Sequence, residues 1–385
     1  MVEWKKLNSV CDILNGYSFK SPLYSPYGIR VIRISDVQSG YISDSNKVYY
    51  PEDLQVEFSK QLLCEGDLVM SLTGNPGRVA KIKENDLPCA LNQRVACLRG
   101  KGINTSYLYY FFNSPEFESI AYANSTGGAQ KNLSTTWLGN FLIPIPSLAE
   151  QERIVGILDT FTASIDNLKE QIELRRKQYE HYRDQLLDLE GKPDEDIKLF
   201  GDYCTMLKGN GVQKVDFVDE GVGCIHYGQI YTHYGSFTYT TNKFVSQEVF
   251  EKARKASKGD IIMTDTSENV EDICKSVAWL GDGDIAVSNH ALIIKHQQNP
   301  KFLSYSTLTK CFFEQKRKYA FGVKVTGIRP EHLAKFSIYL PSLSEQQRIV
   351  SILDTFEASI ANLEAQLTER QKQYEYYRNK LLSFE

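Results

Sequence analysis

Residues 146–190 read PSLAEQERIVGILDTFTASIDNLKEQIELRRKQYEHYRDQLLDLE, and residues 341–385 read PSLSEQQRIVSILDTFEASIANLEAQLTERQKQYEYYRNKLLSFE. The two stretches align without gaps, and about 29 of the 45 positions are identical. A repeat of this length indicates a tandem duplication in which each copy closes a half of roughly 190 residues. We therefore expect whatever one half does to occur twice, at two places related by an approximate two-fold axis.

Each repeated stretch has the pattern of one long amphipathic helix. Ser147 with Glu150, and Ser342 with Glu345, form capping boxes, and a proline precedes each serine. Apolar residues then recur at alternating steps of four and three, which predicts a heptad seam about five repeats long. The seam residues are Ile154, Leu158, Phe161, Ile165, Leu168 and Ile172 in the first helix and Ile349, Leu353, Phe356, Ile360, Leu363 and Leu367 in the second.

The length of these helices constrains the topology. At 1.5 Å per residue each helix runs roughly 60 Å, which is long for a helix packed within one core. Gly191 and Pro193 end the first helix, and a short charged linker follows. If the second helix packs on the first and returns the chain, the two form an antiparallel coiled coil with a globular unit at each end. Two alternatives remain open: the helices belong to two separate cores, or they pair in parallel between two chains.

The segments before the two helices are related more weakly, mainly at apolar, glycine and proline positions. KKLNSVCDILNG aligns with KLFGDYCTMLKG, VIRISDV (31–37) with CIHYGQI (224–230), and EGDLVMSLTG (65–74) with KGDIIMTDTS (258–267). Those short β-branched runs predict strands, and residues 127–146 and 322–341 each predict a loop and short helix leading into a strand.

We therefore predict an α+β fold, in which two tandem α+β domains are joined by two long helices forming an antiparallel coiled coil with pseudo-two-fold symmetry. What the two halves share is apolar scaffold, and what differs between them is polar and lies in turn-like stretches. The predicted boundaries are 1–146 for the first domain, 147–190 for the first helix, 191–197 for the linker, 198–340 for the second domain and 341–385 for the second helix.

Composition sets outer limits on function. The 385 residues are 42% hydrophobic and 24% charged, which is ordinary for a globular protein. No apolar stretch approaches the roughly 20 residues of a membrane span and no signal sequence is present, so we expect a cytoplasmic protein. The eight cysteines form no CxxC pair, which favours reduced thiols over a metal or disulfide framework. The net charge of −4 argues against indiscriminate nucleic-acid binding.

The order of a globular unit, IPIPSLAEQERIVGILD, a second unit and IYLPSLSEQQRIVSILD resembles the specificity (S) subunits of type I restriction-modification enzymes, over essentially the whole chain. The chain begins directly with a recognition domain, whereas some members carry an additional N-terminal piece, so this order is a circular shift of the same cycle. The resemblance implies a non-catalytic DNA-recognition subunit. Each target-recognition domain would read one half of a bipartite DNA site, and the coiled coil would set the gap.

The resemblance also implies partners and cofactors. The coiled coil would dock two methyltransferase (M) subunits, with restriction/motor (R) subunits joining the complex, and no membrane is involved. S-adenosylmethionine, ATP and magnesium would be bound by those partners, and no cofactor or metal by this chain.

Base contacts are expected from polar turns that supply Arg, Lys, Asn or Gln, because these side chains form bidentate hydrogen bonds with guanine and adenine. Each such residue can instead be a turn former or a solvated surface charge. The predicted residues are Asn75, Arg78, Asn92, Gln93, Arg94, Gln130, Lys131 and Asn132 in the first domain and Asn269, Asn289, His290, Lys324, Thr326 and Arg329 in the second, with Ser267 and Glu268 beside Asn269, and with Tyr17, Lys20, Gln213 and Lys214 as weaker candidates.

Arg175 and Arg370 are polar residues at the same seam position of the two helices. They either fix the register of an antiparallel pair or pack their stems and extend the guanidinium into solvent, and we favour the second interpretation slightly. The tyrosine-rich ends YEHYRDQLL and YEYYRNKLL either dock M subunits or cover the neighbouring recognition domain.

Sequence motifs for other functions are absent or weak. The chain lacks a P-loop, a GxGxxG, an N-P-P-[YF] tetrad and an HExxH. PDEDIK (193–198) resembles a nuclease motif only superficially, because its acidic residues are too close together to converge on one metal. The remaining alternative is a protein-binding scaffold with two recognition heads that do not bind DNA, and salt-dependent DNA binding would discriminate the two.

Overall fold

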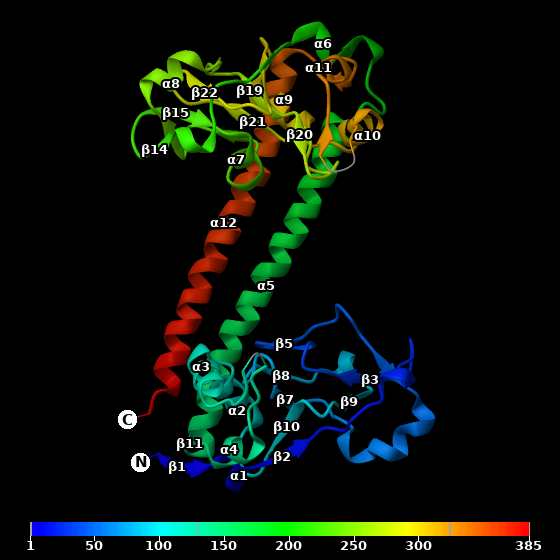
Figure 1. Ribbon diagram of the computed structural model, residues 1–385, viewed down its shortest axis with the longest axis vertical. Coiled ribbons are helices and arrows are strands. Elements are labelled where there is room, and N and C mark those ends of the chain that lie inside the picture. Colours follow the sequence, from blue (N-terminus) through cyan, green and yellow to red (C-terminus); the bar gives the residue numbers. More distant parts are fainter. Residues whose placement is uncertain (1, 129, 323–324, 385) are drawn as a thin grey trace. The chain divides into compact units, whose positions relative to one another are not determined.

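The computed structural model describes residues 2–128, 130–322 and 325–384. The chain divides into two compact units, Met1–Leu168 with Gln366–Glu385, and Lys169–Ala365. Each unit therefore contains one globular domain, one end of the first long helix and the opposite end of the second (Figure 1).

The first globular domain is built on a four-stranded antiparallel sheet in the order β2-β10-β7-β8. A three-stranded sheet, β6-β3-β9, contains the parallel pair β3 and β9. All four residues of β7 are buried, because a central strand is covered on both faces. The strands are β1 (Glu3–Lys6), β2 (Cys11–Asn15), β3 (Ile29–Ile32), β4 (Val37–Gln38), β5 (Tyr41–Ile42), β6 (Tyr49–Tyr50), β7 (Leu68–Ser71), β8 (Val79–Lys81), β9 (Cys89–Leu91), β10 (Val95–Gly100) and β11 (Leu142–Ile145).

Short helices join this sheet to the long helix. The side chain of Asn104 accepts hydrogen bonds from the backbone N–H groups of Ser106 and Tyr107 and so caps α2. Leu98 of the sheet and Leu108 of α2 share one apolar core. The helices are α1 (Leu7–Val10), α2 (Thr105–Phe112), α3 (Pro115–Ala123) and α4 (Thr135–Asn140), with 3-10 turns η1 (Ser21–Leu23), η2 (Glu52–Gln61) and η3 (Glu84–Asp86).

The second globular domain repeats this plan with added strands. Its order β13-β23-β19-β21 corresponds to β2-β10-β7-β8, with β16 added at the edge, and the parallel pair β15 and β22 corresponds to β3 and β9. The strands are β12 (Ile197–Leu199), β13 (Thr205–Lys208), β14 (Phe217–Val218), β15 (Val222–Ile225), β16 (Phe237–Thr238), β17 (Lys243–Val245), β18 (Lys255–Ala256), β19 (Ile261–Thr264), β20 (Thr266–Ser267), β21 (Ser276–Trp279), β22 (Ile285–Val287), β23 (Ala291–Lys295), β24 (Thr326–Gly327) and β25 (Ser337–Tyr339).

The second domain is joined to its long helix by the same strand pairing as the first. The pair β12–β25 corresponds to β1–β11, since each joins the start of a domain to the segment before a long helix. The elements are α6 (Phe200–Tyr203), α7 (Tyr227–Thr232), α8 (Gln247–Lys252), α9 (Pro300–Ser306), α10 (Lys310–Tyr319) and α11 (Pro330–Leu333), with 3-10 turns η4 (Asp194–Asp196) and η5 (Lys214–Asp216).

The predicted strand over residues 224–230 is wrong after Ile225, because α7 begins at Tyr227. The Nδ1 atom of His226 accepts from the backbone N–H of Gly228 at 3.2 Å, and the side-chain oxygen of Gln229 accepts from the N–H of His226 at 2.8 Å. These reciprocal bonds cap the start of a helix. The alignment with VIRISDV concealed them, since His is an unusual N-cap residue.

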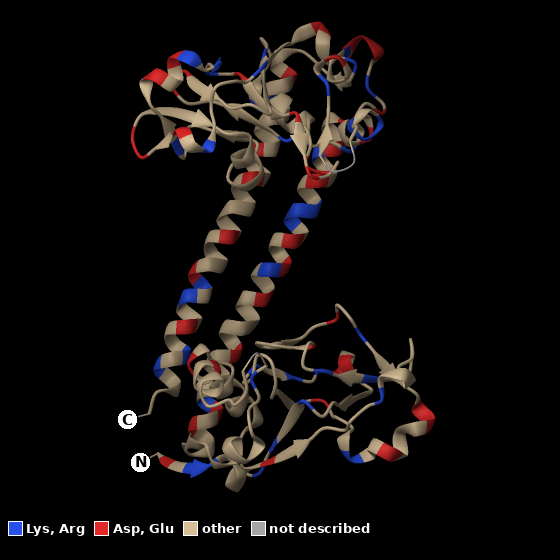
Figure 2. Ribbon diagram, viewed as in Figure 1, with Lys and Arg blue, Asp and Glu red and all other residues tan. Residues whose placement is uncertain are grey.

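The two repeated stretches are uninterrupted helices, α5 (Leu148–Leu187) and α12 (Leu343–Leu382). In the first unit Phe161 of α5 stacks on Tyr377 near the end of α12, and in the second unit Tyr182 near the end of α5 stacks on Phe356 of α12. The helices therefore run antiparallel, which confirms the predicted fold class. Figure 2 shows Lys and Arg interspersed with Asp and Glu along both helices.

The seam residues are buried to different degrees along each helix. The first two in each helix are fully buried because they belong to a domain core. For this part of the helices, the alternative in which each helix belongs to a separate core is therefore correct. The later ones are less completely buried. The core members are Ile154, Leu158, Ile349 and Leu353, and the others are Phe161, Ile165, Leu168, Ile172, Phe356, Ile360, Leu363 and Leu367.

A buried glutamine joins the start of each long helix to its domain. The Gln151 side chain donates to the carbonyl of Pro146 at 2.8 Å and accepts from the backbone N–H of Asn104 at 2.8 Å. Gln346 makes the equivalent two bonds in the second unit. Because Asn104 also caps α2, this glutamine connects the long helix to the first helix after the central strand.

A tyrosine–aspartate pair makes a second connection, two turns further along each helix. The hydroxyl of Tyr110 donates to Asp159 at 2.5 Å, and that of Tyr305 donates to Asp354 at 2.7 Å. Burial raises the pKa of both tyrosine hydroxyls, so both remain protonated donors. The PSLxEQ and ILD segments of the repeat thus hold the helix on its domain.

Glu357 differs between the halves, since the first unit has Thr162 at that position. Its carboxylate accepts from Tyr305 at 3.0 Å, Tyr179 at 3.3 Å and Ser236 at 3.4 Å. Burial raises the pKa of the Glu357 carboxyl, and the hydrogen bonds from the two tyrosines offset part of this effect.

The two seam arginines stack on aromatic rings. The guanidinium carbon of Arg175 lies 5.9 Å from the ring centre of Phe356, and that of Arg370 lies 5.7 Å from that of Phe161. Their stems are partly buried, but the charged groups lie over rings instead of in open solvent. This contact is a cation–π interaction. It agrees with the expected packing of the stems but not with a guanidinium group extended into solvent.

The tyrosines of the two helix ends differ in exposure, and some of them cover the neighbouring domain as one of the two interpretations expected. Tyr179 and Tyr374 pack against the domain cores. Tyr182 and Tyr377 are 44% and 42% exposed, although each stacks on a phenylalanine of the other helix.

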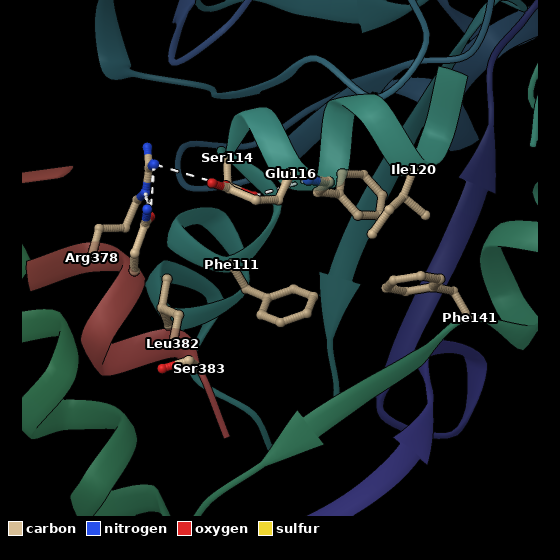
Figure 3. Close-up of a pocket in the computed structure, with 10 residues that line it drawn as sticks. Phe111, Ser114, Glu116, Ile120, Phe141, Arg378, Leu382 and Ser383 are labelled. Atoms are coloured by element: carbon tan, nitrogen blue, oxygen red, sulfur yellow. Dashed lines mark hydrogen bonds and ion pairs between the residues drawn. The ribbon is translucent and has the colours of Figure 1, made fainter. Parts of the chain in front are cut away.

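The end of α12 also forms a wall of an apolar hollow of about 410 Å³ in the first unit (Figure 3). Phe111 and Phe141 extend into it from the domain, and Leu382 from α12. At its rim the buried Arg378 faces Glu116, with the charged atoms 3.9 Å apart. The hollow has both charge signs at its rim and is lined by none of the predicted base-contacting residues.

Replacing Gln151 with Ala should destabilise the chain. The substitution leaves the Asn104 N–H and the Pro146 carbonyl without that partner, and an unsatisfied buried polar group costs about 1–3 kcal/mol. We expect the free energy of unfolding, measured by urea denaturation of the full chain, to fall by about 2 kcal/mol. Glu152→Ala, at the exposed neighbouring position, should change it by less than about 0.5 kcal/mol. An equal loss of stability in the two variants would contradict the role of Gln151 as a clamp, the name we use for the pair of backbone bonds made by Gln151 and by Gln346.

Glu357→Gln should remove a pH dependence of stability. Because the folded-state pKa of Glu357 is raised, the folded protein holds this proton more tightly than the unfolded chain does. That contribution is present below the ordinary carboxyl pKa of about 4.3 and is lost as pH rises through the folded-state value. Melting temperatures measured across this range should fall more for the unmodified chain than for Glu357→Gln. The exposed control Glu152→Gln should follow the unmodified chain, and parallel curves for all three would argue against the effect.

Candidate nucleic-acid interface

Three loops of the first domain meet beside the end of β7. They are the loop after β7, the turn between β9 and β10, and the loop before α4. The N–H of Leu72 donates to the carbonyl of Arg94 at 3.0 Å, and the N–H of Gly74 donates to the carbonyl of Lys131 at 2.9 Å. The three groups of residues predicted from the sequence of this domain therefore lie on one surface, which we call the three-loop patch.

The second domain forms the same patch with the same kind of bonds. The N–H of Asp265 donates to the carbonyl of His290 at 3.2 Å, and the N–H of Ile328 donates to the carbonyl of Asp265 at 3.0 Å. Strand β20 pairs with β24, which brings the loop after β19 against the loop before α11. Residues distant in sequence are thus brought together by backbone contacts, which depend little on the side chains that the loops carry.

A glycine beneath the turn between β9 and β10 makes this arrangement possible. A Cβ atom at Gly16 would lie 1.9 Å from the carbonyl oxygen of Asn92, and one at Gly209 would lie 2.2 Å from the equivalent carbonyl. The close approach lets the N–H of Gln93 donate to the carbonyl of Tyr17 at 2.9 Å. These two glycines align when KKLNSVCDILNG is compared with KLFGDYCTMLKG, and the approach of two backbones explains why each is required.

Three predicted base-contacting residues of the first domain have structural roles. Arg78 is half-buried and donates to the side chain of Gln38 at 2.9 Å. Asn92 is buried and its side-chain oxygen accepts from a backbone N–H of its own turn. Asn132 accepts from the hydroxyl of Thr73 at 2.9 Å. These residues hold the loops in shape.

The other candidates of the first domain face outward. Asn75, Gln93, Arg94 and Gln130 have exposed side chains, and the ammonium group of Lys131 lies 5.3 Å from the ring centre of Tyr122. The exposed set supplies both amide and guanidinium donors, which suits contacts with base edges or phosphates.

In the second domain the division is similar. Asn269 accepts from the N–H of Asp272 at 2.7 Å and donates to its carboxylate at 2.9 Å, so it shapes its loop. Thr326 is buried, and Arg329 lies over the ring of Phe321. Lys324 lies outside the described residues.

Asn289 and His290 are exposed between two hollows of the second domain, of about 640 and 460 Å³. Both hollows are lined by His290, Lys214 and Tyr227. Burial lowers the pKa of the neighbouring His226, and Lys214 and His290 act in the same direction. Tyr227 was missed from the sequence because its segment was expected to be a strand.

Two further features bear on function. Among the described residues no three His, Cys, Asp or Glu side chains are grouped so as to hold a metal ion. Within the same ranges, no helix combines the length and apolar character needed to cross a bilayer.

Two related α+β domains on an antiparallel coiled coil, each presenting a loop patch of its own composition, define a protein that recognises a target with two heads. The sequence profile of the type I restriction modification DNA specificity domain matches residues 1–175 and 227–371. The chain therefore belongs to this family and is a specificity subunit of a type I restriction-modification system, as the resemblance implied.

Characterised relatives agree with this assignment. The chain is 28% identical over 405 aligned positions to a putative type I restriction enzyme specificity subunit of Haemophilus influenzae, covering 100% of this chain and 96% of the relative. It is 29% identical to the EcoR124I/EcoR124II specificity subunit of Escherichia coli, over 72% of this chain and 70% of that subunit. A match to the Escherichia coli EcoAI specificity subunit is 33% identical but spans 48% of this chain and 32% of that protein.

Solved structures share the fold at lower identity. The type I restriction-modification S subunit from M. genitalium has a TM-score of 0.57 at 15% identity, covering 100% of this chain and 97% of that chain. A chain from a structure titled for the assembly and conformational transition of the type I system has a TM-score of 0.59 at 16% identity, over 99% and 97% of the two chains. The fold with two domains and a coiled-coil spacer is therefore shared with S subunits.

Gly16→Ala should disrupt the first three-loop patch. The added Cβ meets the Asn92 carbonyl at 1.9 Å, so the turn must move and the bond from Gln93 to Tyr17 must break. We expect a lower melting temperature and faster hydrogen exchange at the Gln93 amide. Gly128→Ala, whose Cβ would have no atom within 4 Å, is the matched control and should leave both unchanged. Unchanged exchange at Gln93 in Gly16→Ala would refute this role of the glycine.

Proposed function

We propose that each globular domain reads one half of an asymmetric bipartite DNA site through its three-loop patch. The observation that carries this proposal is the set of corresponding backbone hydrogen bonds in the two patches, combined with different outward side chains. The framework bond from Leu72 to Arg94 recurs as the bond from Asp265 to His290. A shared framework gives both domains the same way of approaching DNA, while different side chains give each its own sequence.

The coiled coil is proposed to set the gap between the two half-sites. Each long helix begins inside one domain core, where buried apolar residues and the glutamine clamp hold it. A helix held in this way at its start transmits position rigidly, so the number of seam turns determines the spacing of the readers.

The coiled coil also supports the proposal that two M subunits dock, one on each unit. Each unit carries the same partly exposed arrangement, an arginine and a tyrosine that both contact one phenylalanine: Arg370, Tyr377 and Phe161 in the first, with the matching set in the second. Tyr and Arg are enriched at protein interfaces. R subunits would complete the complex, and the partners would bind S-adenosylmethionine, ATP and magnesium, leaving this chain without catalysis.

A protein-binding scaffold that does not contact DNA is the second candidate, favoured by the net charge of −4 and by the mixed charges in Figure 2. Binding to DNA through phosphates weakens steeply as salt is raised, because condensed counterions are released. Titration of the purified chain with duplex DNA at two salt concentrations separates the candidates. If the chain does not bind DNA even at low salt, the scaffold is favoured.

The proposal predicts that recognition is modular. Exchanging residues 1–146 for the first domain of a relative with a known half-site should change one half of the methylated motif. The other half and the gap should remain, because the second domain and both helices are unaltered. Methylome sequencing of a host that expresses the exchanged chain with its M subunits measures the motif, and the unaltered chain is the control. A change in both halves, or in the gap, would contradict independent reading.

A further inference from the structure

The second three-loop patch contains a buried carboxylate oxygen that has no partner. Asp265 is 5% exposed, and its Oδ2 lies 3.0 Å from the Nζ of Lys208. No donor in the described ranges lies within hydrogen-bond distance of its Oδ1. Buried polar atoms are almost always bonded, so an orphaned acceptor at a recognition surface requires an explanation.

The imidazole of His290 is placed to satisfy this oxygen. Its Nδ1 lies 4.0 Å from Asp265 Oδ1, and its side chain is 51% exposed, so the ring has room for the small rotation that completes a hydrogen bond. The backbone of His290 has a φ of 65°, a left-handed conformation that few residues other than glycine adopt. Rare backbone conformations cluster at functional sites, where surrounding contacts hold them.

The first domain shows why an aspartate is needed here. Leu72 and Arg94 occupy the positions of Asp265 and His290 and share the same backbone bond. Arginine has only donors, so its hydrogen-bonding character needs no second residue to define it. A neutral histidine presents either a donor or an acceptor from each ring nitrogen, and the bond made by one nitrogen determines what the other presents.

The surroundings of His290 fix the direction in which its outer nitrogen points. The ring lies edge to face with that of Tyr227, with ring centres 5.3 Å apart, and both residues line the two hollows of this domain. With Nδ1 turned inward to Asp265, Nε2 is directed away from the buried carboxylate, on the exposed side of the ring.

We propose that Asp265 holds the neutral His290 ring with its hydrogen on Nδ1, so that Nε2 offers a lone pair that reads an exocyclic amino group, adenine N6 or cytosine N4, in the major groove. This inference rests on the proposed function of the second domain. Guanine offers N7 and O6 and thymine offers O4, which are all acceptors, so neither can bond to that lone pair. Asp265 is therefore a positioning residue, and His290 is the side chain that contacts the base.

In vitro selection tests the inference with the full chain and its M subunits. Random duplexes that keep the first half-site are selected at about pH 8, above the range in which imidazoles ordinarily titrate. We expect the unmodified chain to select A or C at one position of the second half-site. His290→Ala should lose this preference, with about tenfold weaker binding to the preferred duplex. His290→Arg should switch the preference to guanine, as arginine presents only donors.

Two further variants separate positioning from general stability. Asp265→Asn should admit G or T at the same position, because an amide can accept from or donate to the ring and so permits either tautomer. Lys208→Met removes the ion pair but keeps the carboxylate, and it should retain the original preference. Tighter binding to duplexes that carry the first half-site than to duplexes in which it is scrambled reports folding in every variant.

The outcomes distinguish a failure of this inference from a failure of the proposed function on which it rests. A preference for G or T at the position controlled by His290, or an Asp265→Asn variant that selects as the unmodified chain does, overturns the inference alone. A chain that selects no bipartite sequence overturns both the inference and the proposed function.

Discussion

The burial of the first turns of each long helix in a domain core is the contact on which the rest of this structure depends. Ile154 and Leu158 are part of the first core, and Ile349 and Leu353 are part of the second. Polar bonds then fix the direction of each helix, because Gln151 and Gln346 each satisfy two backbone groups of the adjoining domain. Without these contacts, the start of each helix would be free to change its direction relative to the domain that holds it.

The three-loop patch combines a shared backbone framework with outward side chains that differ between the two domains. The loops are joined by bonds between backbone groups, and the closest approach requires glycine at Gly16 and Gly209. Side chains such as Arg94 and His290 are outside this framework and can differ between the domains. Other candidates, among them Asn92 and Asn132, are used internally to hold the loops.

The asymmetry between the halves concentrates where one domain needs a polar contact that the other lacks. Asp265 replaces an apolar Leu72 beside the outward histidine, and Glu357 replaces Thr162 beside the tyrosine that joins helix and domain. Asp265 is buried and Glu357 is half-buried, and both are acids on an otherwise repeated scaffold. Desolvation makes such groups costly, so their presence in one half indicates a role specific to that half.

The sequence alone determined the duplication, the two long helices, their heptad seam and the family resemblance, because these features repeat at fixed spacing and need only local periodicity to be read. It also placed the candidate residues in loops that the structure brings together. It did not separate loop-shaping residues such as Arg78 from outward ones such as Arg94, and it mistook the start of α7 for a strand. Only the tertiary structure decided these points, since burial, capping and the pairing of a carboxylate with a distant imidazole depend on contacts between segments far apart in the chain.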